Sequence, residues 1–206
     1  SYYLKSIGGY HPAKLRRYQE LIEAYIHPEM NKIYGAVAQA GGDMTQVNGD
    51  SIFPVLNMLN AKYFILPLQN GQQVPLQNPY VHGNAWFVDN VKYVDNATLT
   101  AYDANELKYD VNSATGGIVV FSDIYYPGWT ATVDGQDVPV GRVDYVLRAI
   151  NVGKGQHKVV LTFKPKSVEI TEGIAYCAYA VLFIAMLFIA YNEYKKRKIL
   201  KDGNKE

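Results

Sequence analysis

A cluster of cationic side chains near the start of the chain is the first feature that could do chemistry. The run YHPAKLRRY at residues 10–18 has the pattern of a helix start and contains His11, Lys14, Arg16 and Arg17. The amino terminus of a helix carries unpaired N–H groups and a partial positive charge, so cations added there suit a phosphate group. We predict that these four side chains help to hold an anionic lipid phosphate. The alternative is a solvated helix face that makes ordinary salt bridges.

A second candidate site is the aromatic segment at residues 121–135, FSDIYYPGWTATVDG, in which two tyrosines and a tryptophan flank a Pro-Gly turn. Amphipathic rings exposed beside a turn can stack on a sugar ring, which makes Tyr126 and Trp129 candidate ligand-binding residues. The alternative, which the pattern favours for Trp129, is that the indole fills the core between two sheets.

Other catalytic and metal-binding patterns are lacking. The four histidines form no HxxxH or HxH pair, and a run that begins at Asp110 has too few acidic positions for a calcium loop. No GxGxxG, phosphate-binding glycine loop or GxSxG sequence occurs. The single cysteine, Cys177, excludes an internal disulfide framework. We therefore expect no metal and no cofactor in this chain.

The elements that position these residues begin with helices. Pro12 occupies a plausible first helical position, and apolar residues then recur at helical spacing as far as Ile26. We expect the helix to weaken at His27, because the following proline disfavours the α region, and to resume until Gly41. A further short helix is predicted over 54–60, where two asparagines share one face and either meet a ligand or cap a loop.

From residue 62 onward the pattern changes to short runs of β-branched and aromatic residues between turn residues. This spacing predicts an antiparallel, jelly-roll-like β-sandwich, with turns at Asp134–Gly135 and Gly153–Gly155. The fold class is therefore α+β, with a helical segment over 1–60 and a β-sandwich domain over 61–168. The expected strands lie near 62–66, 85–94, 106–112, 117–123, 129–134, 143–150 and 157–164.

A long uncharged run near the end of the chain predicts a transmembrane helix over 173–191. Its 19 residues span roughly 28 Å at about 1.5 Å per residue, close to the thickness of a bilayer core. The alternative is a buried helix of a soluble domain, which would normally keep one polar face. The span thus indicates a protein of the lipid bilayer.

Charge sets the expected orientation of this helix. The tail at 192–206 holds six Lys or Arg and three Asp or Glu, so it is predicted to be cytoplasmic and residues 1–172 extracytoplasmic. The first residues show no initiator Met and no signal peptide, as in a fragment of a multi-spanning protein or a chain whose signal has been removed. The whole chain has 206 residues and a net charge of +1, which excludes a nucleic-acid binder that relies on bulk charge.

Several sequence blocks carry a resemblance to a known family. Read in order, the chain resembles the C-terminal region of the bacterial YfhO family of multi-spanning membrane proteins. The blocks are YHPAKLRRYQELIE at 10–23, VLNMLNAKYFI at 55–65, NPYVHGNAWFV at 78–88, and YYPGWTATVDG with RVDYVLRAINVGKGQHKVVLTFKP within 125–165.

The resemblance implies a polytopic glycosyltransferase that takes a sugar from a polyprenyl-phosphate carrier and adds it to a cell-envelope glycopolymer. In such enzymes the catalytic carboxylate belongs to an early extracytoplasmic loop, which this chain does not contain, so no catalytic residue is carried over. Two non-enzymatic alternatives stay open. The chain could be a membrane-anchored β-sandwich module that binds glycans, or a structural lid on the membrane body.

Overall fold

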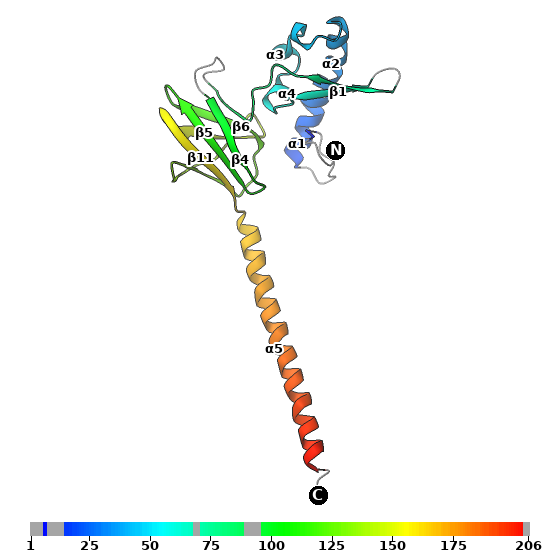
Figure 1. Cartoon of the computed structure of the whole chain (residues 1–206), viewed down its shortest axis with the longest axis vertical. Coiled ribbons are helices and arrows are strands. Elements are labelled where there is room, and N and C mark those ends of the chain that lie inside the picture. Colours follow the sequence, from blue (N-terminus) through cyan, green and yellow to red (C-terminus); the bar gives the residue numbers. More distant parts are fainter. Residues whose placement is uncertain (1–5, 8–14, 68–70, 89–95, 204–206) are drawn as a thin grey trace. The chain divides into compact units, whose positions relative to one another are not determined.

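The computed structural model describes residues 6–7, 15–67, 71–88 and 96–203 of the chain. The chain divides into two units, Ser1–Phe163 and Lys164–Glu206. The first unit contains short helices and three antiparallel sheets, and the second contains one long helix (Figure 1). The expected α+β class, with a sandwich of antiparallel sheets, is therefore confirmed.

The first helical stretch was expected to weaken at His27 and then to resume; it continues through His27, and the turn just before it is a π-helix. A regular α-helix would bring the ring of Pro28 against the carbonyl four residues earlier, but the turn before it is a wider π-helix. The stretch ends where expected, at Gly41 and Gly42, whose φ angles are +63° and +90°. Pro12, the expected helix start, lies outside the described residues. The elements are α1 (Arg16–Leu21), η1 (Ile22–Ile26) and α2 (His27–Gln39).

Three short helices follow, and the last confirms the helix expected over 54–60. Its amino terminus is capped from a distance by the carboxylate of Glu29, whose two oxygens each accept a backbone N–H at 3.0 Å, from Val55 and Leu56. Burial raises the pKa of Glu29, and the two hydrogen bonds act in the opposite direction. The elements are η2 (Met44–Gln46), α3 (Gly49–Ile52) and α4 (Pro54–Met58).

The strands form a pair, a four-stranded sheet and a five-stranded sheet, with orders β1-β2, β3-β6-β10-β9 and β4-β5-β11-β7-β8. In Figure 1, β4, β5 and β11 lie side by side, and the helices α1 to α4 gather around β1. The strands are β1 (Tyr63–Pro67), β2 (Gln73–Gln77), β3 (Ala85–Phe87), β4 (Asn96–Tyr102), β5 (Glu106–Ser113), β6 (Gly117–Ile124), β7 (Trp129–Val133), β8 (Gln136–Val138), β9 (Gly141–Val143), β10 (Leu147–Val152) and β11 (Gly155–Phe163).

Two strand predictions needed correction, and three strands, β2, β4 and β8, had not been predicted. The strand expected over 85–94 ends at Phe87, and residues 89–95 lie outside the described part. The strand expected over 143–150 is split by a turn at Asp144 and Tyr145, which both adopt positive φ. Sequence patterns did not indicate β2, which contains an edge-tolerated proline, or β4, which is rich in small residues.

The four-stranded sheet is covered on both faces. One face packs on the five-stranded sheet around Phe121 and Ile150, while Val120 and Leu147 point to the other side, toward the helices and β1. A strand buried on both faces loses the alternation of polar and apolar residues, and β6 accordingly has three consecutive buried residues at its centre. The first unit therefore has three layers: helices with β1 and β2, then four strands, then five strands.

The second unit consists of helix α5 (Lys166–Gly203). Its stretch Lys166–Lys196 is the one helix among the described residues that is long and apolar enough to cross a membrane. The uncharged run over 173–191 lies inside this stretch.

Candidate functional site

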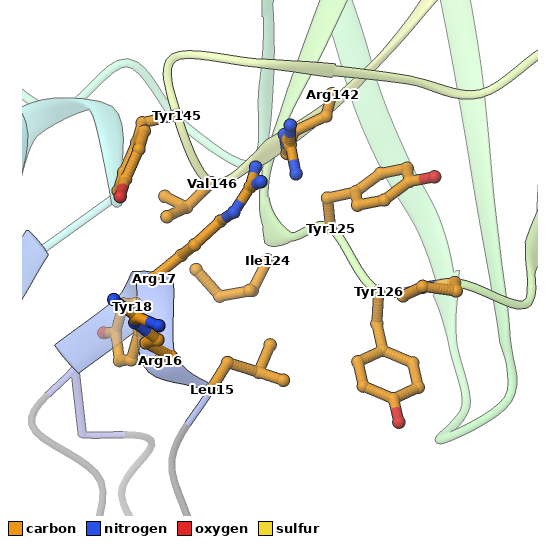
Figure 2. Close-up of a pocket in the computed structure, with 11 residues that line it drawn as sticks. Leu15, Arg16, Arg17, Tyr18, Ile124, Tyr125, Tyr126, Arg142, Tyr145 and Val146 are labelled. Atoms are coloured by element: carbon orange, nitrogen blue, oxygen red, sulfur yellow. The ribbon is translucent and has the colours of Figure 1, made fainter. Parts of the chain in front are cut away.

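A pocket of about 260 Å³ joins the two segments that the sequence singled out. Its walls come from the start of α1, from the end of β6 with the turn after it, and from the hairpin between β9 and β10 (Figure 2). We call it the arginine pocket. It is lined by Leu15, Arg16, Arg17, Tyr18, Ile124, Tyr125, Tyr126, Pro127, Arg142, Tyr145 and Val146.

Two arginines that form no ion pair with a described residue face this pocket. Figure 2 shows the guanidinium ends of Arg17 and Arg142 converging over the centre of the site. The guanidinium carbon of Arg17 lies 5.8 Å from the ring centroid of Tyr145, and that of Arg142 lies 5.9 Å from the ring centroid of Tyr125. In the described part of the chain, neither arginine has a carboxylate oxygen within ion-pair distance. The charge of Arg17 helps to lower the pKa of Glu20, but neither guanidinium makes a direct ion pair there, so both can bind an anion in the pocket.

Arg16 differs from these two arginines. Its Nε lies 3.0 Å from a carboxylate oxygen of Glu20, one helical turn away, and its side chain is 93% exposed. This pair is the ordinary salt bridge that the alternative interpretation foresaw, and such an exposed pair contributes little stability.

The wall formed by Tyr145 is held in a strained backbone conformation. Asp144 and Tyr145 have φ angles of +43° and +67°, in the left-handed region that non-glycine residues rarely adopt. The hydroxyl of Tyr145 donates to the carboxylate of Glu20, and this hydrogen bond, with that from Arg16, holds the pKa of Glu20 below its usual range. Strain of this kind persists where surrounding contacts enforce it, and it is common at functional sites.

The remaining wall of the pocket is mostly apolar. Leu15, Ile124 and Val146 supply aliphatic surface, and Tyr18 donates its hydroxyl to the carbonyl of Ile7. Burial raises the pKa of Tyr18 to about 12, so this phenol stays neutral at physiological pH. The site therefore combines cations, aromatic rings and an apolar wall, which suits a phosphate attached to an uncharged group.

The predicted site residues are partly brought together. Arg16, Arg17 and Tyr126 line the arginine pocket, whereas His11 and Lys14 lie outside the described residues. Trp129 is not among the lining residues. The sequence analysis missed Arg142 as a site residue, because no local spacing pairs it with α1.

Trp129 makes contacts typical of a core residue. The guanidinium carbon of Arg148 lies 3.9 Å from the indole centroid, and the ring of Phe163 lies 5.2 Å from it. The indole already has a cation and a ring as neighbours, and these contacts argue against Trp129 as a platform on which a sugar stacks.

The two asparagines of the short helical segment, Asn57 and Asn60, make hydrogen bonds that join loops. Asn57 is fully buried, donates to the carbonyl of Gly49 at 3.2 Å and accepts from Asn78 at 2.9 Å. Asn60 donates to the side chain of Asn84 at 2.8 Å. Of the two alternatives for Asn57 and Asn60, the structural one agrees with these contacts.

Among the described residues, no group of three His, Cys, Asp or Glu side chains could hold a metal ion. Among the described histidines, His157 forms an ion pair, with its Nδ1 2.7 Å from Oδ2 of Asp134. This pair joins β11 to the turn between β7 and β8.

The pair between His157 and Asp134 predicts a pH dependence of stability. The hydrogen bond to Asp134 raises the pKa of His157, so its stabilising effect is complete below about pH 6.5 and disappears as the pH rises through the folded-state pKa. The pKa of Asp134 is lowered, so this carboxylate stays ionised throughout that range. We expect His157→Gln to reduce the melting temperature more at about pH 5.5 than at about pH 8.5. Thermal unfolding of this variant and of His27→Gln, an exposed control, tests this; equal reductions at both pH values would contradict it.

Comparisons with known proteins gave one match. A family model described as bacterial membrane protein YfhO matches residues 54–174, which is more than half of the chain. The matched region contains α4, all three sheets and the first residues of α5, and it includes Arg142 but not α1. Searches of the curated proteins and of the solved structures found no match.

Proposed function

The chain belongs to the YfhO family of bacterial membrane proteins, and from this premise we propose that it binds the phosphate of a polyprenyl-phosphate-linked sugar. In this proposal the chain is part of a multi-spanning protein that resembles glycosyltransferases acting on cell-envelope glycopolymers. The arginine pocket is its donor phosphate site.

The observation that carries the proposal is the convergence of Arg17 and Arg142 without carboxylate partners among the described residues. A guanidinium presents a planar fork of N–H donors that matches phosphate oxygens, and two of them can share one phosphate. The rings of Tyr125 and Tyr145 orient the two arginines, and the aliphatic wall offers contact to an apolar or sugar portion.

The proposed role in sugar transfer is to stabilise the leaving group. Transfer of a sugar from a lipid phosphate to a hydroxyl requires a base for the hydroxyl proton and cations for the phosphate that departs. The arginine pocket supplies the cations. The base is the carboxylate that the family resemblance assigns to an early extracytoplasmic loop.

The proposed topology follows from the charge distribution. The basic tail over 192–206 is cytoplasmic, the helix over 173–191 spans the bilayer, and residues 1–172 lie outside the cytoplasm. This arrangement places the helical segment over 1–60 and the β-sandwich over 61–168 on the side where lipid-linked sugars are consumed.

Binding of geranyl phosphate to the full chain in lipid nanodiscs tests the donor site. We expect Arg17→Gln with Arg142→Gln to weaken binding at least about tenfold, because each lost charge-assisted hydrogen bond is worth roughly 1.5–3 kcal/mol. The matched control, Lys62→Gln with Lys108→Gln, removes the same charge from residues that do not line the pocket. Two controls, geraniol in place of geranyl phosphate and nanodiscs without protein, measure how much of the ligand partitions into the lipid. Equal affinities of the wild type and the arginine variant would refute the proposal.

A further inference from the structure

The five-stranded sheet carries a second hollow, of about 650 Å³, which shares no lining residue with the arginine pocket. Its lining comes from β4, β5, β11 and the turn after β7. We call it the polar hollow. None of its lining residues is Phe, Tyr or Trp, in contrast to the arginine pocket.

The register of the strands places three carboxamides in one row across the polar hollow. Asn112 on β5 lies opposite Asn96 on β4 and opposite Gln156 on β11. Directly opposed residues share a face of the sheet, and neighbouring strands lie about 4.8 Å apart. All three side chains are exposed, and none has a hydrogen-bond partner in the part of the chain that the structure describes.

A second row lies two residues along the strands. Asp110 on β5 is opposite Thr98 on β4 and Lys158 on β11, so the two rows together form a grid of six polar side chains. The alternating residues, such as Val111 and Val159, are buried, which confirms that both rows belong to the outer face.

Each carboxylate of the polar hollow lies beside a basic side chain, and the charges balance when His157 is protonated. Nζ of Lys158 lies 3.8 Å from Asp110, and the imidazole of His157 lies 2.7 Å from Asp134. Each carboxylate among the lining residues therefore already has a basic partner. A strongly anionic or cationic ligand gains nothing from such a surface, whereas a neutral ligand rich in hydrogen-bonding groups does.

We propose that the polar hollow binds a neutral, polyhydroxylated polymer, either a glycan or a linear polyol. A carboxamide both donates and accepts hydrogen bonds, as a hydroxyl does, so a row of three can pair with successive hydroxyl groups along one chain. This inference deepens the proposed function, on which it rests for the existence of an acceptor polymer. In this inference the acceptor polymer binds to the row formed by Asn96, Asn112 and Gln156, and not to Trp129.

Biolayer interferometry of the full chain in lipid nanodiscs tests the inference with three probes. Maltohexaose and chitohexaose represent the glycan source, and linear polyglycerol represents the polyol source. We expect saturable binding of at least one probe, weakened at least about tenfold by Asn112→Ala with Gln156→Ala. The matched control, Gln73→Ala with Gln77→Ala, removes two exposed carboxamides from β2 and should leave binding unchanged.

Each outcome bears on the inference. Absence of saturable binding by the folded wild type for all three probes would overturn it, as would equal binding by the Asn112 and Gln156 variant. Circular dichroism verifies that the variants are folded. Geranyl phosphate binding is measured on the same samples. Intact phosphate binding without polymer binding would refute the polar hollow but not the donor site. Polymer binding without phosphate binding would refute the donor site but not the polar hollow.

Discussion

Replacing Asp123 by alanine is expected to lower the free energy of unfolding by about 3–5 kcal/mol, because it leaves a buried guanidinium without its counter-charge. Oδ2 of Asp123 lies 3.0 Å from Nη2 of Arg148, whose side chain is only 3% exposed between the two sheets. The other two nitrogens of that guanidinium, Nε and Nη1, are buried without a hydrogen-bond partner. Burial accordingly lowers the pKa of Arg148, and the charge of Asp123 acts against that shift.

The two partners of this ion pair should not be equivalent. The side chain of Asp123 is 37% exposed, so water can solvate it when the arginine is removed. We expect Arg148→Met, which keeps an unbranched chain against Trp129, to change stability by less than about 1 kcal/mol. The double variant should match Arg148→Met rather than add the two effects.

Denaturant unfolding followed by tryptophan fluorescence measures all three variants, with near-ultraviolet circular dichroism as a second probe because Trp129 itself neighbours the change. Equal costs for Asp123→Ala and Arg148→Met would show that the burial of the guanidinium is not the dominant effect.

Features that depend on local chemistry could be predicted from the sequence. The helix end at Gly41 and the hairpin turn at Asp134–Gly135 both need positive φ, and the structure has both, with φ angles of +63°, +51° and +82°. In the sequence of β11, Val159 and Leu161 alternate with Lys158 and Thr162, which indicates the face that meets the core, and both apolar residues are fully buried.

Features that depend on distant residues could not be predicted in this way. The turn at Asp144 and Tyr145 lacks glycine, and its strained backbone is held by a contact between Tyr145 and Glu20 on α1. Arg148 lies on a buried strand, and its charge there is accounted for by the carboxylate of Asp123 on the neighbouring strand β6 and by the indole of Trp129.

The same limit applies to the candidate sites. Composition drew attention to Arg16 and Arg17, but Arg142 lines the same pocket only because tertiary folding brings β9 to the start of α1. Conversely, the row formed by Asn96, Asn112 and Gln156 depends on strand order β4-β5-β11, and β4 itself had no clear sequence signal. A site built across strands requires the register before its residues can be recognised as neighbours.

Gly49→Ala is expected to destabilise the chain by about 3 kcal/mol or more, because there is no room for a methyl group. A Cβ at this position would lie 2.2 Å from Cδ2 of Tyr80 and 2.7 Å from Cζ of Phe53. Neither ring can easily retreat. Phe53 is fully buried, and the single hydroxyl proton of Tyr80 is shared between the carbonyls of Val47 at 2.5 Å and Thr45 at 3.2 Å.

Gly35→Ala provides a matched control with the opposite expected sign. Gly35 lies on the exposed face of α2, and a Cβ there would meet nothing within 4 Å. Alanine in a helix interior is favoured over glycine by about 0.5–1 kcal/mol, so this variant should be more stable than the wild type.

In a Tyr80→Ala background, the loss of stability caused by Gly49→Ala should be less than about half of the loss that it causes in the wild type, because the closest ring is gone. Thermal and denaturant unfolding of the four variants tests both expectations, and a Gly49→Ala protein as stable as Gly35→Ala would show that the packing of Tyr80 against α3 does not constrain the fold.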